Sequence, residues 1–111
     1  MDISFNGFGS NALTFLANEK IPAGTLVGLT DNGTVGPCEN SIPLGQVLNG
    51  TDTHACVCVR GVITAPCDPS LPVGPVCLAC DSHGALCEAE DGVMKYVLSV
   101  DTDNSTAEIL L

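Results

Sequence analysis

Short apolar segments alternate with turn-forming residues along the whole chain. Twelve Gly and seven Pro are spread through it, and these two residue types interrupt regular helices. The apolar segments have the length and the Val, Ile, Leu and Thr content of strands. They cover residues 13–17, 25–29, 42–48, 53–65, 76–79, 85–87, 95–100 and 107–111. Only residues 11–20 are also compatible with a short helix. Many short strands at regular spacing predict an all-β protein, a small compact β-barrel or sandwich.

The chain also resembles itself at an offset of fifty residues. IPAGTLVGLTDNG, residues 21–33, aligns with LPVGPVCLACDSHG, residues 71–84. In each copy a Pro-x-Gly turn precedes an apolar strand, and a turn with Asp and Gly follows it, as in a hairpin. We therefore predict a single β domain, residues 12–111, with two related halves at 21–59 and 71–111, preceded by an extended N-terminal arm, residues 1–11.

The longest apolar segment, residues 53–65, is predicted to form one strand. From Ala55 to Thr64 both of its faces are apolar, apart from Arg60. A strand that is apolar on both faces is normally buried on both. We expect it at the centre of a sheet or at a subunit contact.

The charge balance excludes some classes of partner. The chain of 111 residues carries 13 acidic and 3 basic residues, a formal net charge of −10. Nucleic-acid binding needs clustered Lys or Arg, but Lys20, Arg60 and Lys95 stand far apart in the sequence. We expect no nucleic-acid partner and, for the same reason, no membrane partner. No apolar run approaches the ~20 residues that span a bilayer, and the N-terminal sequence lacks the features of a signal peptide.

The apolar content is high for a surface-rich chain of this size. Apolar residues make up 45% and charged residues only 14% of the sequence, against about 25% charged in typical domains. This excess indicates that part of the surface is buried against other chains. The sequence does not identify the residues of that contact.

The seven cysteines can form disulfides, bind a metal or stay free. Their odd number and the lack of an export signal disfavour a disulfide framework. Cys56 and Cys58 stand on one face of a predicted strand, where parallel Cβ directions also disfavour a bond. We expect most of the seven to be reduced and packed as small apolar side chains.

A zinc-binding β module is the alternative. Cys77, Cys80, His83 and Cys87 have the spacing C-x2-C-x2-H-x3-C, and four such ligands suit a closed tetrahedral site. If residues 77–80 are extended, alternation places Cys77 and Cys80 on opposite faces. The internal repeat also aligns these two cysteines with a valine and a threonine, which favours packing positions over ligands.

No group of residues forms a catalytic motif. His54 and His83 lie among polar turn residues, and no serine stands in a G-x-S-x-G pattern. The carboxylates fall mostly in turns, where they provide a solvated acidic surface. We therefore predict a protein that is not an enzyme and that uses no metal or other cofactor.

Four longer segments share features with a known family. They are PAGTLVGLTDNGTVGPCENSIPLGQVL, VCVRGVITAP, LPVGPVCLACDSHGALCEAEDG and YVLSVDTDNSTAEILL. They contain two G-x-x-V strands, an R-G-V central strand, a D-x-x-G turn and an apolar terminal strand. In these features residues 13–111 resemble small bacteriophage head decoration proteins, also called capsid cement or stabilisation proteins. The richness in cysteine departs from that family pattern.

The resemblance implies a structural virion protein without catalytic activity. Members of the family form compact β folds, usually trimers, which bind the major capsid protein on the outer capsid surface. The chain would be made in the host cytoplasm and would stabilise the shell. The N-terminal segment often contacts the capsid, which would assign that contact here to Phe5, Phe8 and Asn11. A cellular β-barrel adaptor or ligand-binding domain is a further alternative.

Overall fold

The computed structural model describes residues 11–111, which form ten β-strands and no helix. The first half contains β1 (Asn11–Ala17), β2 (Leu26–Asp31), β3 (Thr34–Pro37), β4 (Gly45–Gly50) and β5 (His54–Arg60). The second half contains β6 (Val62–Pro66), β7 (Gly74–Cys80), β8 (Leu86–Glu88), β9 (Val93–Asp101) and β10 (Thr106–Leu110). The all-β prediction is confirmed, and the candidate helix at 11–20 contains strand β1. Residues 11–111 thus include no helix that is long and apolar enough to cross a membrane.

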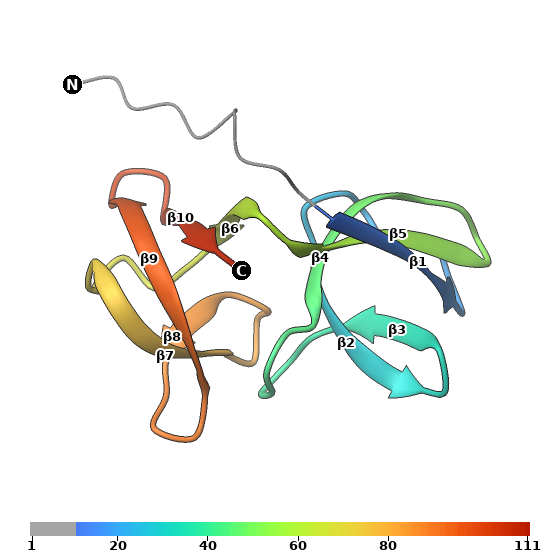
Figure 1. The fold of residues 1–111 in the computed structure, drawn as a ribbon, viewed down its shortest axis with the longest axis horizontal. Helices are drawn as coiled ribbons and strands as arrows, with labels where there is room; N and C mark the ends of the chain where they lie inside the picture. Colours follow the sequence, from blue (N-terminus) through green and yellow to red (C-terminus); the bar gives the residue numbers. More distant parts are fainter. Residues whose placement is uncertain (1–10) are drawn as a thin grey trace.

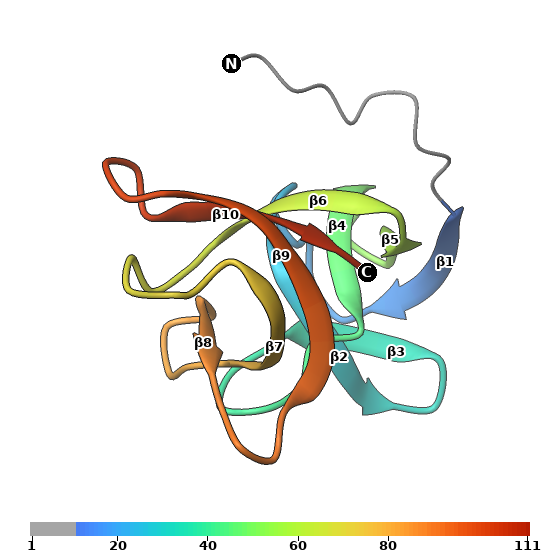
Figure 2. The same ribbon diagram turned by 60° about the vertical axis from the view of Figure 1, so that its left-hand side comes forward.

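The ten strands form two five-stranded sheets that lie side by side (Figure 1). The first half closes into a barrel in the order β1-β3-β2-β4-β5. The second half has the order β6-β10-β9-β7-β8. Figure 2 shows the long strand β9 curving across this second sheet between β10 and β7. Hairpin pairing explains most of these neighbours, because short turns join antiparallel strands.

The two halves pair their strands in the same order. When β6 to β10 are placed opposite β1 to β5, the second sheet has the same neighbours as the barrel. The barrel closes through a parallel contact of Ala17 with Val35. The second sheet has a parallel bridge at the corresponding place, between Cys67 and Leu86. The pairing unit therefore starts at β1 and β6, ahead of the ranges 21–59 and 71–111 covered by the sequence repeat.

The predicted single strand at 53–65 is wrong. The segment is divided at Gly61 into β5 and β6, because Gly61 has a φ of 124°, a conformation that interrupts a strand and is open mainly to glycine. The chain thereby leaves the barrel and enters the second sheet. Strand β5 is apolar on both faces because it lies between the two cores, with Val57 in one and Cys58 in the other.

Two apolar clusters fill the halves, and one of them crosses the junction. The barrel interior contains Ala17, Ile21, Val27, Val35, Val47, Ala55 and Val57. The second cluster consists of inward side chains of the second sheet together with Leu26, Cys38 and Cys58 of the first half. Strand β5 thus directs Val57 into the barrel and Cys58 into the neighbouring core, as strand alternation requires. The two halves share one continuous apolar interior at their contact.

Candidate functional site

The predicted capsid contacts lie at or beyond the start of β1. Phe5 and Phe8 are outside the described residues. Asn11 is exposed at the first position of β1 and pairs with Arg60 of β5. Strand β1 pairs with β3 only through Leu16 and Ala17. Within the described chain, residues 11–15 therefore pair on one side only, and the N-terminal segment joins the barrel at an open strand edge.

An apolar row crosses the outer face of the second sheet. Pro75 pairs with Tyr96, Tyr96 with Leu110 and Leu110 with Val62, so these four side chains lie on one face of neighbouring strands. We call these four residues the outer row. Tyr96 is 53% exposed, whereas its neighbour Val97 points inward and is 1% exposed. Strand β9 is thus apolar on both faces, a pattern that the sequence analysis did not single out.

The barrel has a corresponding row, and that row is covered. Leu26 pairs with Gln46, Gln46 with Cys58 and Cys58 with Ala12. This row crosses β2, β4, β5 and β1, the counterparts of the strands crossed by the outer row. Leu26, Gln46 and Cys58 are buried, and Leu26 and Cys58 pack into the core of the second half. The same face of the fold is therefore covered in the first half and open in the second.

Ile63 of the second half lies in the shared core, and the residue at the corresponding position of the barrel, Leu13, is exposed. Ile63 of β6 pairs with Ile109, belongs to the shared core and is 4% exposed. Leu13 of β1 pairs with Val57 at the corresponding position, yet Leu13 is 55% exposed. Within residues 11–111, Tyr96 of the outer row and Leu13 at the start of the barrel thus both remain exposed. We call the surface around Leu13 the barrel end.

On one side of the outer row, the outer face of the second sheet is polar. The Ser99 hydroxyl donates a hydrogen bond of 3.1 Å to the Glu108 carboxylate. Thr64 pairs with Glu108 on the adjacent strand. Polar side chains therefore border the outer row on this side, whereas on the other side the outer face continues with Met94 and Cys77.

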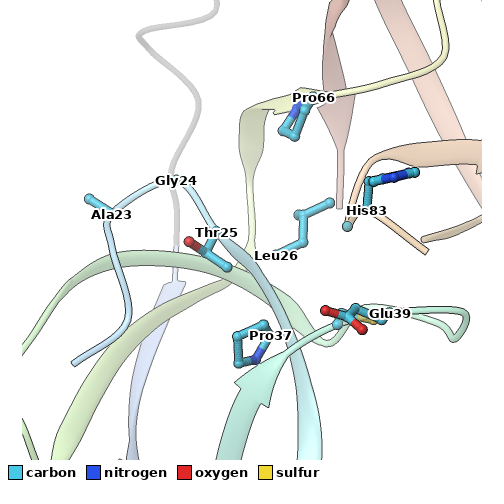
Figure 3. A pocket seen from close by; sticks show the side chains of 10 residues that line it. Ala23, Gly24, Thr25, Leu26, Pro37, Glu39, Pro66 and His83 are labelled. Atoms are coloured by element: carbon cyan, nitrogen blue, oxygen red, sulfur yellow. The ribbon is translucent and has the colours of Figure 1, made fainter. Parts of the chain in front are cut away.

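A cavity of about 320 Å³ lies at the junction of the two halves (Figure 3). Thr25, Pro37 and Glu39 come from the first half, and Pro66 and His83 from the second. Cys38 also lines it. His83 donates its backbone N–H to Asp81 and sits in an exposed turn. A thiol, an imidazole and a carboxylate line this cavity, but in residues 11–111 no hydrogen bond joins them: the Cys38 thiol contacts Ser41, and the His83 ring contacts Ser82. Covalent catalysis needs the nucleophile and base within hydrogen-bond reach.

The zinc alternative is wrong. Cys80 faces the core at the end of β7, whereas Cys77 lies on the opposite, outer face. Cys87 pairs with Ala79 and is directed outward as well. Residues 11–111 contain no group of three or more His, Cys, Asp and Glu side chains placed to hold a metal. The alternation of β7 separates ligands that are close in sequence.

Three of the cysteine thiols have raised pKa values, which favours their protonated form. Burial, a hydrogen bond to Cys38 and nearby negative charge raise the pKa of Cys80 well above its ordinary value. Burial also raises the pKa of Cys67 and of Cys87. Since the thiolate is the reactive species, these cysteines are not activated nucleophiles. All seven are unpaired in the structure, as expected from the sequence.

Three turn carboxylates have depressed pKa values. Backbone N–H groups of Ser70 and of His83 hydrogen-bond to Asp68 and Asp81, respectively, and lower their pKa values. The side-chain amide of Asn104 lowers the pKa of Asp101 in the same way. These carboxylates accept hydrogen bonds from their own turns, so their first role is to fix turn geometry.

Comparison with known proteins identifies one informative likeness. No family model matches the chain, and no curated protein matches it. Among solved structures, the head fiber gp8.5 N base in bacteriophage phi29 is similar, with a TM-score of 0.59 and 17% sequence identity. The match covers 93% of this chain and 94% of that chain. At this identity the likeness shows a common fold extending over nearly the full length of both.

Proposed function

We propose that this chain is a structural protein of a bacteriophage virion that binds the outer surface of the capsid as a homotrimer and stabilises the shell. One observation carries the proposal: its fold follows the base of a phage head fiber over 93% of the chain. The sequence resemblance to head decoration proteins independently supports a role on the phage head. The role requires protein surfaces only, without catalysis, cofactor or nucleic acid.

In this proposal the N-terminal segment makes the capsid contact. It joins the barrel at Asn11, at an open edge of β1, where an extended partner segment gains main-chain hydrogen bonds. Full burial of the ring of Phe5 or Phe8 is worth roughly 1.5–3 kcal/mol, reduced by the ordering of a glycine-containing segment. Three such contacts on one trimer can raise the apparent affinity by ~10²–10⁴ over one contact.

The trimer contact in this proposal repeats the junction inside the chain. The covered row of the barrel packs on the second half, and the outer row, Val62, Pro75, Tyr96 and Leu110, is its exposed counterpart. The covered row packs on the second half near Ile63. Leu13 is the exposed residue at the corresponding position of the barrel. The outer row of one copy therefore suits the barrel end of the next. Such a head-to-tail contact closes a ring when its rotation fits.

Low charge at this contact matters because the chain carries a net charge of −10. Copies of so acidic a chain repel each other unless the contact excludes charge. The four residues of the outer row are uncharged, which satisfies this condition. Protein bound only to the assembled shell then stabilises that shell by mass action.

The capsid role is tested by co-sedimentation with purified heads of the phage that encodes the chain. We expect the full chain to bind, and the chain without residues 1–10 to fold and keep its oligomeric mass but lose binding. The double substitution of Phe5 and Phe8 by Ala should weaken binding strongly. The matched control replaces Asn6 and Ser10 by Ala and should bind normally.

The outcomes separate the parts of the proposal. A full chain that forms trimers but never binds heads contradicts the capsid role and favours the cellular adaptor alternative. Undiminished binding without residues 1–10 contradicts the arm contact and moves it to the β domain. A monomeric chain that binds heads contradicts the trimer alone.

A further inference from the structure

Two buried thiols from different halves meet at the junction. Cys38 follows β3 in the first half and is 2% exposed, and Cys80 ends β7 in the second half and is 3% exposed. The Cys38 thiol lies 3.4 Å from the carbonyl oxygen of Ser41, which also accepts the N–H of Cys80, and both cysteines belong to the shared apolar core. No sequence motif brings them together, since one follows a strand of the first sheet and the other ends a strand of the second.

Backbone hydrogen bonds hold the two segments side by side. The N–H of Cys80 donates to the carbonyl of Ser41 over 2.8 Å. The N–H of Asn40 donates to the carbonyl of Asp81 over 3.1 Å. These bonds lie next to the two cysteines and hold their chain segments together. Proximity on a rigid backbone is the main requirement for forming a disulfide without distortion.

From this geometry we propose that Cys38 and Cys80 form a disulfide, which links the two halves when the protein meets a low-molecular-weight disulfide as oxidant. The proposal does not depend on the capsid role. The other cysteines are less suited: Cys56 and Cys58 lie on the same strand, and Cys67 lies at the parallel bridge with Leu86.

The reaction is two successive thiol–disulfide exchanges. Cys38 lines the junction cavity, so its thiolate attacks one sulfur of the oxidant and releases the first small thiolate, which takes up the Cys38 proton. Cys80 then loses its proton and attacks the Cys38 sulfur of the mixed disulfide, which expels the second small thiolate. Two protein thiols are oxidised and one small disulfide is reduced to two thiols.

Burial makes the second exchange slow. The pKa of Cys80 is raised by desolvation and by its hydrogen bond to Cys38, so its thiolate is scarce at neutral pH. The pair therefore persists as thiols in a reducing compartment and closes gradually under oxidising conditions. The rate of closure should rise with pH.

The disulfide would add a second covalent link between halves that the chain otherwise joins only at Gly61. It closes the segment from Cys38 to Cys80 into a loop, which restricts the unfolded chain. A loop of this length should raise the Tm by on the order of 10 °C. The reduced and oxidised forms should have the same strands.

The test is oxidation by 2-hydroxyethyl disulfide, followed by trypsin digestion without reductant. Cleavage after Lys20, Arg60 and Lys95 separates Cys38 from Cys80 into peptides 21–60 and 61–95. We expect these peptides to appear joined, at their summed mass less two hydrogens. The experiment is run on the full chain and on a variant with Cys56, Cys77 and Cys87 replaced by Ser, which removes the half-buried thiols.

Further substitutions identify the pair. Cys38→Ala or Cys80→Ala should abolish the joined peptide and the rise in Tm. The matched changes Cys58→Ala and Cys67→Ala, also at buried cysteines, should preserve both. A second arm refolds the chain from denaturant in the same oxidant, so that burial cannot block the reaction. Free Cys38 and Cys80 thiols in both arms, or a joined peptide that persists without Cys38, would overturn the proposal.

Discussion

The side-chain amide of Gln46 donates a hydrogen bond of 2.7 Å to the backbone carbonyl of Thr64, and so ties β4 of the barrel to β6 of the second sheet. The same nitrogen donates to the carbonyl of Gly24 over 3.0 Å. Gln46 is the buried polar residue at this contact. It lies in the covered row, so its hydrogen bonds join the two halves within an otherwise apolar surface.

Removing this amide should loosen the junction. Gln46→Met keeps the length of the side chain but leaves two carbonyls without a donor, so we expect a loss of about 2–4 kcal/mol in the free energy of unfolding. Denaturant titration measures it. Asn49→Leu, at an exposed position of the same strand, is the control and should change stability little. Equal stability of the two variants would show that water replaces the amide.

Gly45 should tolerate no side chain. A Cβ there would overlap the carbonyl oxygen of Cys58 and lie 2.8 Å from a methyl of Val57. We expect Gly45→Ala to lower stability by roughly 3 kcal/mol, as overpacking of a close backbone contact does. At Gly28 the nearest atoms are 3.8 Å from the added Cβ, so Gly28→Ala is the matched control. Thermal unfolding of both variants checks the difference. A small effect of Gly45→Ala would mean that the contact between β4 and β5 can widen.

Asp101 should make the protein sensitive to acid. Hydrogen bonds from Asn104 lower its pKa below the ordinary 3.8. A carboxylate with a lowered folded pKa stabilises the fold above the unfolded value, and this contribution disappears as pH falls below about 4. Wild type and Asp101→Asn should therefore differ at neutral pH and converge in acid. Asp103→Asn is the control, because the hydrogen bonds of this turn go to Asp101. A difference independent of pH would assign the effect to the loss of shape alone.

Charge on the outer row should prevent oligomerisation. Tyr96→Glu places a carboxylate in the proposed trimer contact, where desolvation without a partner is costly. We expect light scattering to show monomers, and Leu13→Glu on the opposing surface to give the same result. Leu48→Glu, at an exposed apolar residue outside both surfaces (47% exposed), should leave the oligomer intact. Trimers of Tyr96→Glu would move the contact elsewhere.

The all-β class and most strands followed from local patterns. Apolar segments bounded by Gly, Pro and Asp turns have few alternatives to short strands, since hairpin turns depend on residues adjacent in sequence. The repeat of strand pairing could be anticipated in part from the aligned turns at 21–33 and 71–84. Strands β1 and β6 lay outside that alignment. They take equivalent places in the two sheets, but their sequences are not similar.

What the sequence by itself determined is the local conformation: strands, turns, an acidic surface and the scarcity of helix-forming segments. Only the tertiary structure decided which faces meet. It separated Cys77 from Cys80 by strand alternation, brought Cys38 to Cys80 across the junction, and divided residues 53–65 between two sheets at Gly61. It also buried the row around Gln46 while leaving Tyr96 open. The reason is physical: backbone propensity acts between neighbours in the chain, whereas burial depends on distant segments packing together.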